Sequence, residues 1–183
     1  MPNKFPVERY RPAALPDIGP ALLTHLYDEF TRISQALIAF PVALNVNETQ
    51  LGVPVTTIPT EFRLFEGVDA TLDLPGGDWD SVLGEYKVPT TGLFQINLNS
   101  TSSAVGAGNK DWQALVRLYV DDVEIWGVND SGQDDFPLTC QLSVSGRLVR
   151  DSIVRASIEL VHEQFVGSTT VTAFMNLTQV AQE

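Results

Sequence analysis

The chain has 183 residues, enough for one good hydrophobic core and an additional arm rather than for two domains. Its 11 Lys and Arg residues are scattered among 23 acids and the formal net charge is −12, which excludes nucleic acid or an anionic membrane surface as the main partner. Only 19 % of the residues are charged, which predicts a surface partly hidden by partners or covered with Ser, Thr, Asn and Gln. The N-terminus lacks the apolar core of a signal peptide, and no apolar stretch reaches membrane-spanning length.

Residues 1–19 are predicted to form an extended arm. Prolines at positions 2, 6, 12 and 16 prevent a helix or a central strand. Aromatic, basic and apolar side chains between these prolines are unusual for a plain linker, and such an arm can order in a groove on another protein. The alternative is a disordered tail. The candidate docking residues are Phe5, Arg9, Tyr10, Arg11 and Leu15.

Residues 20–40 are predicted to form an amphipathic helix, with Pro20 at its first position and Pro41 ending it. Its apolar residues recur at alternating steps of three and four, which is the a/d pattern of a coiled coil. A stripe this narrow favours a short bundle of several copies over a helix packed on its own domain, although both interpretations stay open. The predicted seam consists of Leu23, Leu26, Phe30, Ile33, Leu37 and Phe40.

From residue 41 the pattern changes to a period of two and keeps it to the end of the chain. Short alternating runs with turn signals every eight to twelve residues are typical of an all-β sandwich or barrel. A small, polar, Gly-rich loop is expected at residues 100–110. The predicted strands lie near residues 42–46, 62–65, 70–74, 85–88, 92–99, 114–120, 123–128, 138–144, 153–161 and 169–177.

Residues 86–96, YKVPTTGLFQI, resemble the strand–turn–strand of the tumour-necrosis-factor and complement-type jelly rolls. In this segment Pro89 ends one strand, Gly92 permits the turn and Phe94 points inward. The segments 115–122 and 171–177 resemble the central hairpin and the last core strand of that fold, so the resemblance covers roughly residues 84–180. It implies an antiparallel jelly-roll β-sandwich over residues 41–183, and the family's members are typically trimers.

The N-terminal part resembles a second group of proteins. A proline-rich arm followed by the helix at residues 26–37, LYDEFTRISQAL, is similar to the N-termini of many virion proteins of tailed bacteriophages. This resemblance implies a fibre, decoration or tail component on the surface of a phage particle, made in the host cytoplasm. Its partners would be further copies of itself in a three-stranded helix bundle and other virion proteins of the capsid, portal or tail.

No pattern of catalytic residues is visible. His25 flanks the helical seam and His162 stands beside Glu163, while Cys140 lies in an alternating run that predicts a buried apolar position. The motifs of serine hydrolases, zinc proteases and phosphate-binding loops are missing from the sequence. The aspartates near positions 78, 121 and 134 lie at expected turns. We therefore expect neither an enzyme nor a bound metal ion or cofactor.

Two tryptophans are candidates for binding a host glycan, because an aromatic ring beside acids and amides suits a sugar. Trp79 follows a Gly-Gly turn and Trp112 follows the expected loop, whereas Trp126 is assigned to the core. A structural role for Trp79 and Trp112, at the rim of the sandwich or at a subunit contact, is the favoured alternative. The main hypothesis is thus a homotrimeric structural protein of a phage particle, and the second is a receptor- or glycan-binding fibre tip.

Overall fold

The computed structural model describes residues 24–30, 42–74, 76–106 and 110–182. The chain divides into two units, residues 1–41 and residues 42–183. In the first unit, residues 24–30 form a helix, as the heptad pattern predicts. Among the described residues, no helix is long and apolar enough to cross a membrane.

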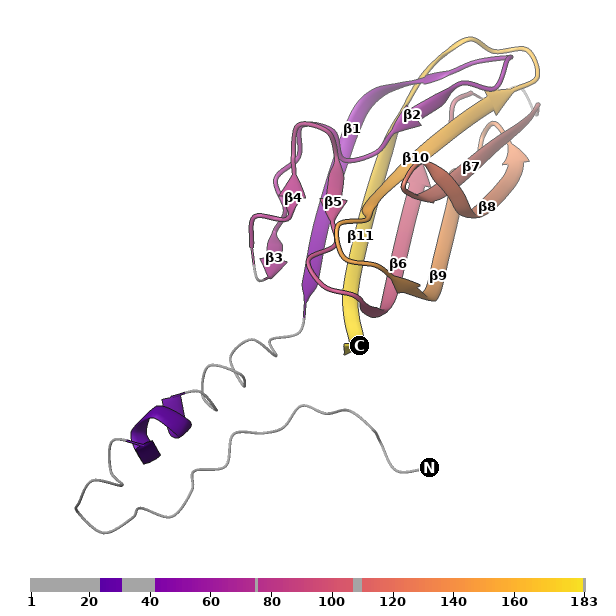
Figure 1. Cartoon of the computed structure of the whole chain (residues 1–183). Helices are drawn as coiled ribbons and strands as arrows, with labels where there is room; N and C mark the ends of the chain where they lie inside the picture. The colour runs from indigo at the N-terminus through magenta and orange to yellow at the C-terminus, as the bar shows by residue number, and fades with distance from the viewer. Residues whose placement is uncertain (1–23, 31–41, 75, 107–109, 183) are drawn as a thin grey trace. The chain divides into compact units, whose positions relative to one another are not determined.

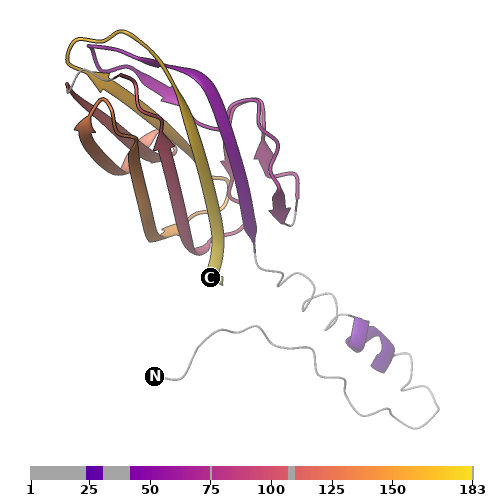
Figure 2. The same ribbon diagram turned by 180° about the vertical axis from the view of Figure 1, so that it is seen from behind.

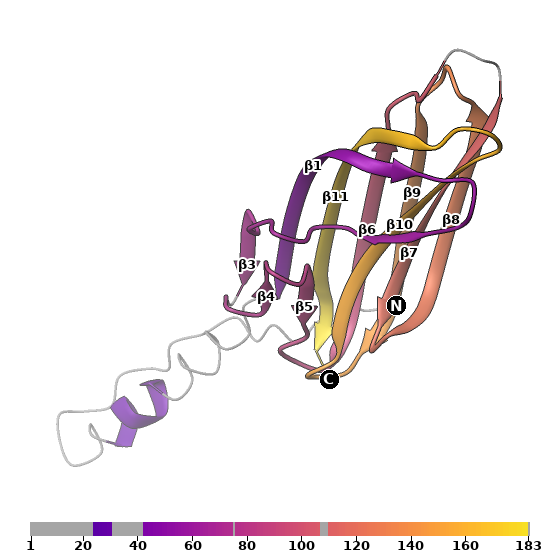
Figure 3. The same cartoon turned by 90° about the horizontal axis from the view of Figure 1, so that it is seen from above.

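The second unit consists of two antiparallel sheets stacked as layers (Figure 1 and Figure 3). The first sheet has the order β3-β1-β11-β6-β9. Its strands are β3 (Leu72–Leu74), β1 (Ala43–Val55), β11 (Gly167–Gln182), β6 (Gly92–Ser102) and β9 (Leu138–Leu148). The second sheet has the order β4-β5-β10-β7-β8, with β2 paired to β10. Its strands are β4 (Trp79–Asp80), β5 (Glu85–Lys87), β10 (Ile153–His162), β7 (Asp111–Val120), β8 (Val123–Gln133) and β2 (Glu61–Arg63).

The core lies between the two sheets and is built from the inward half of each alternating strand. Strand β6 shows this most clearly, because every second one of its residues is buried. Strand β10 lies in the middle of its sheet and alternates in the same way except at residues 156–158, which are all buried. Phe94 is fully buried, as the sequence predicts, and so is Tyr86. Strands β1 and β11 are remote in sequence but pair along almost their whole length, with Ala43 opposite Thr178 at one end and Val55 opposite Gly167 at the other (Figure 2).

Two turns illustrate how the sequence directs the chain. Asp121 and Asp122 both have positive φ, 51° and 62°, and they join β7 to β8 as a tight hairpin whose turn twists in the sense that strands require. Gly92 has a role different from the expected one. A Cβ at this position would lie 2.3 Å from the carbonyl oxygen of Ala181, so glycine is needed for the close approach of β6 to β11 rather than for a turn.

The assignment of Trp126 to the core is wrong in part, because 36 % of this residue is exposed. Strands β8 and β9 are the edge strands of their sheets and lie next to each other at one side of the sandwich. The ring of Trp126 passes over Gly146 of β9, where an added Cβ would be 3.2 Å from the ring. Trp126 therefore closes the open edge between the sheets and keeps one side in solvent.

Candidate functional site

The segment around Trp79 is shaped by one carboxylate. Asp73 lies in β3, and its Oδ2 accepts hydrogen bonds from the backbone N–H groups of Gly77, Asp78 and Trp79 at 2.7, 3.1 and 3.3 Å. Three donors converging on one oxygen fold the Gly-Gly turn into a fixed shape. The sequence predicts this turn, and its carboxylate-centred geometry is visible only in the structure.

Trp79 itself is half-buried. Its indole Nε1 donates to the carbonyl oxygen of Val68 at 2.8 Å, and its ring meets the ring of Phe65 edge to face with centroids 6.5 Å apart. Both contacts lie within the protein, so they hold the indole in place as a wall of the turn.

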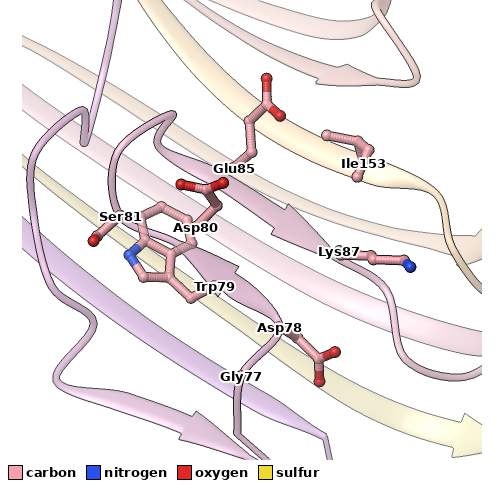
Figure 4. A pocket seen from close by; sticks show the side chains of 8 residues that line it. All are labelled: Gly77, Asp78, Trp79, Asp80, Ser81, Glu85, Lys87 and Ile153. Atoms are coloured by element: carbon pink, nitrogen blue, oxygen red, sulfur yellow. The ribbon is translucent and has the colours of Figure 1, made fainter.

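Beside Trp79 lies a hollow of about 450 Å³, drawn in Figure 4. Its lining comes from the turn before β4, from β4 and β5, and from the start of β10. The lining residues are Gly77, Asp78, Trp79, Asp80, Ser81, Glu85, Lys87 and Ile153. Acids outnumber bases here, so any ligand of this hollow would be neutral or cationic rather than anionic.

Most charged groups of the hollow are already paired within the protein. Glu85 receives a hydrogen bond from Arg63 Nη1 at 2.9 Å, and Lys87 Nζ lies 2.9 Å from Asp151. Asp80 Oδ1 accepts the backbone N–H groups of the following turn. Partial burial, followed by the negative charge of Asp73, raises the pKa of Asp78. The hollow is therefore part of a structural turn region, and Trp79 forms one of its sides.

Trp112 lies in a different environment from Trp79. Its side chain is buried, with 1 % of the residue exposed, and its Nε1 donates to the carbonyl oxygen of Gln133 at 3.1 Å. The residue therefore packs in the core near the start of β7, and its ring offers no surface to a ligand. The expected loop before it begins later than predicted, because β6 continues to Ser102.

His162 and Asp134 form a buried pair that the sequence does not reveal. The exposed fractions are 2 % for His162 and 5 % for Asp134, and His162 Nε2 lies 3.5 Å from Asp134 Oδ2. His162 Nδ1 accepts hydrogen bonds from the N–H groups of Gln164 and Phe165, at 3.1 and 2.9 Å. Since Nδ1 is an acceptor, the proton sits on Nε2 and faces the carboxylate. Glu163, the sequence neighbour, is not the partner of this histidine.

Nothing in this pair points to catalysis, because both groups are enclosed: Nδ1 of the ring accepts two backbone N–H groups, and Nε2 faces the Asp134 carboxylate at 3.5 Å without forming a hydrogen bond. Cys140 is also buried, as predicted; burial raises the pKa of its thiol to about 11, and its Sγ donates to the carbonyl oxygen of Ala114 at 3.4 Å. Among the residues that the structure describes, no group of three or more His, Cys, Asp or Glu side chains is placed to hold a metal ion.

Of the predicted helical seam, Leu26 and Phe30 lie on the described helix, and they are 41 % and 68 % exposed. The other seam residues lie outside the described residues: Leu23, Ile33, Leu37 and Phe40. The predicted docking arm lies outside them as well: Phe5, Arg9, Tyr10, Arg11 and Leu15.

Solved structures show which fold this is. The globular domain of zebrafish complement 1qA protein matches with a TM-score of 0.55 at 15 % identity, over 78 % of this chain and 99 % of that one. The Eiger TNF from S. frugiperda matches with a TM-score of 0.51 at 12 % identity, over 78 % of this chain and 94 % of that one. The fold is a jelly roll of this kind. The predicted fold class, a mainly β antiparallel jelly-roll sandwich, is confirmed.

A third structure, the PRD1 vertex protein P5, matches with a TM-score of 0.49 at 14 % identity, over 76 % of this chain and 96 % of that one. No protein-family model matches the sequence, and no curated protein matches it. At identities this low the likeness extends to the fold and not to activity or partners.

Proposed function

We propose that this chain is a structural component of a bacteriophage particle, a homotrimeric decoration or fibre protein on the virion surface. In this proposal the arm at residues 1–19 and the helix at residues 20–40 dock on the capsid or tail, and residues 41–183 project as jelly rolls. Further copies of the chain and other virion proteins are its partners, and it works without a cofactor or catalysis.

The observation that carries the proposal is the helix placed before the jelly roll. Its seam residues Leu26 and Phe30 are large, apolar and exposed in a single copy, which is the arrangement expected of a helix that packs against further copies. The N-terminal resemblance to tailed-phage virion proteins supports the location on the particle. The excess of acids would limit adhesion to nucleic acid and to anionic envelopes.

The native mass of the purified protein, measured by light scattering with and without residues 1–40, tests the assembly. A mass of about 60 kDa, three times 20.0 kDa, is expected for the full chain. Loss of this mass on truncation would assign the main contact to the helix, and its survival would assign the contact to the jelly roll. A full-length mass of 20 kDa would contradict the trimer.

A second candidate is a receptor-recognising module that holds a host glycan, and the hollow beside Trp79 is the observation that favours it. A glycan array probed with the wild type and with Trp79→Phe tests this candidate. Phenylalanine keeps the packing against Phe65 but gives a sugar a smaller surface. Binding by the wild type that the variant loses would support the module, and no binding by either protein would leave the structural role.

A further inference from the structure

The loop between β10 and β11, residues 163–166, is held by one ring nitrogen of His162. Nδ1 of this histidine accepts the backbone N–H groups of Gln164 and Phe165 at 3.1 and 2.9 Å. The imidazole also meets the ring of Phe165 edge to face, with centroids 5.7 Å apart. Both hydrogen bonds need a lone pair on Nδ1, so they exist only while the imidazole is neutral.

Strand pairing fixes the two ends of the β10–β11 loop. His162 lies opposite Trp112 in the ladder between β10 and β7. Gly167 lies opposite Val55 in the ladder between β11 and β1. The side chains of residues 163–166, between these ends, are all exposed. A short exposed segment with firmly paired ends can open locally while the sandwich stays folded.

One carboxylate is placed to favour a charged ring. Oδ2 of Asp134, in the turn between β8 and β9, lies 3.5 Å from Nε2 of His162, and both residues are buried. An opposite charge at this distance favours a protonated imidazole. In the described parts of the surrounding loops, the other charged residues are exposed, so solvent and salt screen them. They are Lys110, Asp111, Asp135 and Glu163.

A second proton on the ring would set these contacts against one another. Protonation of Nδ1 converts the acceptor of two N–H groups into a donor that faces them, and this repels the backbone of Gln164 and Phe165. The same proton gives the ring a positive charge beside the carboxylate of Asp134. The charged ring therefore stays with Asp134, and the β10–β11 loop has to move.

We propose that the β10–β11 loop is acid-sensitive and is released from the end of the sandwich when His162 takes up a second proton. Histidine is the side chain that ordinarily changes its charge between about pH 5 and 8, so release is expected in mildly acidic solution. The loop carries Phe165 and Val166, which are 37 % and 70 % exposed. Release separates the ring of Phe165 from His162, so acid increases the apolar surface that this end of the sandwich presents. This inference goes beyond the proposed function and requires neither assembly nor a phage particle.

Amide hydrogen exchange in the full chain tests the inference, with protection factors corrected for the effect of pH on intrinsic exchange. We expect the protection of the amides of Gln164 and Phe165 to fall at least about tenfold between about pH 7.5 and about pH 5, while the amides of β10 and β11 stay protected. Unchanged protection of the two loop amides would contradict the inference. Loss of protection throughout β10 and β11 at the same pH would also contradict it, because acid would then unfold the domain and not the loop.

His162→Asn is the matched variant. The Oδ1 atom of asparagine can replace Nδ1 as the acceptor of the two N–H groups, but it gains no proton in this pH range. We expect the two loop amides to have the same protection at both pH values in this variant. Glu163→Gln removes the adjacent exposed carboxyl group and is expected to keep the pH dependence of the wild type. An equal loss of protection in His162→Asn and the wild type would overturn the inference.

A measurement on the wild type covers the case in which His162→Asn does not fold. The nitrogen chemical shifts of the His162 ring report protonation of Nδ1, and we expect this protonation to have the same midpoint as the loss of amide protection. Asp134→Asn removes the negative charge but keeps an oxygen toward the N–H of Lys110. In this variant both midpoints should move to lower pH. Separate midpoints in the wild type, or midpoints that Asp134→Asn leaves unchanged, would overturn the inference.

Discussion

Glu48 is a carboxylic acid on the inward side of β1, and only 8 % of the residue is exposed. Its Oε1 accepts a hydrogen bond from the backbone N–H of Phe65 at 2.7 Å. Phe65 is fully buried and has a φ of 67°, in the left-handed region that phenylalanine seldom adopts. Glu48 therefore holds a strained backbone position in place.

Burial raises the pKa of Glu48 above its usual value of 4.5. The carboxyl group therefore binds its proton more tightly in the native chain than in the unfolded chain. The free energy of unfolding of the wild type should therefore fall as the pH rises from 4.5 through the raised pKa. Glu48→Gln keeps the acceptor for Phe65 but cannot ionise, so we expect its stability to increase relative to the wild type over the same window. Urea denaturation at several pH values measures this difference.

Glu48→Ala provides the complementary measurement. It leaves the buried N–H of Phe65 without an acceptor, which costs about 1–3 kcal/mol relative to the glutamine variant. Glu163→Gln removes an exposed carboxyl group and serves as the control. The same pH dependence in Glu48→Gln and the wild type would show that Glu48 is not the group responsible.

Whether the sequence predicts the environment of a residue depends on how far away in the sequence its main contact partner lies. The inward position of Phe94 and the turn at Asp121 follow from local alternation and turn chemistry, so the sequence predicts them. The partial exposure of Trp126 follows from β8 being an edge strand, which is a property of the sheet and not of the segment. The pairing of His162 with Asp134 joins two loops that no sequence motif connects.

At the level of elements, the buried pair of His162 and Asp134 connects the loops at one end of the sandwich. The backbone of Asp134 accepts hydrogen bonds from Val105 and Gly106 at 3.0 Å and donates to Lys110. His162 binds the backbone of the loop between β10 and β11. A single buried contact therefore connects the loops that follow β6, β8 and β10.

We expect His162→Phe to lower the free energy of unfolding by about 2–4 kcal/mol, because two N–H groups lose their acceptor and the buried carboxylate of Asp134 loses the polar ring nitrogen that faces it. Thermal unfolding followed by circular dichroism measures the loss. Glu163→Gln is again the control, since it alters the adjacent residue without touching the pair. An unchanged melting temperature in His162→Phe would mean that the loops are held by other contacts.

The helix at residues 24–30 carries a prediction of its own. Phe30→Asp, or Ile33→Asp one seam position later, places a charge in the proposed seam and is expected to break the assembly, because a carboxylate cannot be buried there unpaired. Light scattering at micromolar concentration measures the mass. Thr24→Asp, at an exposed position outside the seam, is the control. A Phe30→Asp protein that stays trimeric would show that the helix does not organise the trimer.

On the scale of the whole molecule, we expect a chain without residues 1–19 to fold and to lose attachment to phage particles. The jelly roll begins at Ala43, so removal of the arm leaves its strands intact. Co-sedimentation with particles measures attachment, and circular dichroism confirms that the sandwich is folded. Retained attachment would transfer the docking role to the helix or to the jelly roll.

The overall architecture is partly visible in the sequence. The alternating runs predict the strands, and the resemblance of residues 86–96 to the strand–turn–strand of known jelly rolls implies the jelly roll. The pairing of β1 with β11 brings together residues more than a hundred positions apart, which periodicity does not encode. The low proportion of charged residues predicts a surface that is partly hidden by partners or rich in Ser, Thr, Asn and Gln, and only the sheet registers show that such polar residues gather on one face.

The long ladder between β1 and β11 has a mechanical consequence. In the proposed mode of attachment the domain is held at the start of β1, and a load applied at the far end of the sandwich pulls β1 lengthwise past β11. Such a pull shears all the ladder hydrogen bonds at once, from Ala43 opposite Thr178 to Val55 opposite Gly167. A pull on the start of β1 and the end of β11 would instead unzip the same bonds one pair at a time. The domain should therefore resist force more strongly when it is pulled from the start of β1 and the far end of the sandwich than when it is pulled from the start of β1 and the end of β11.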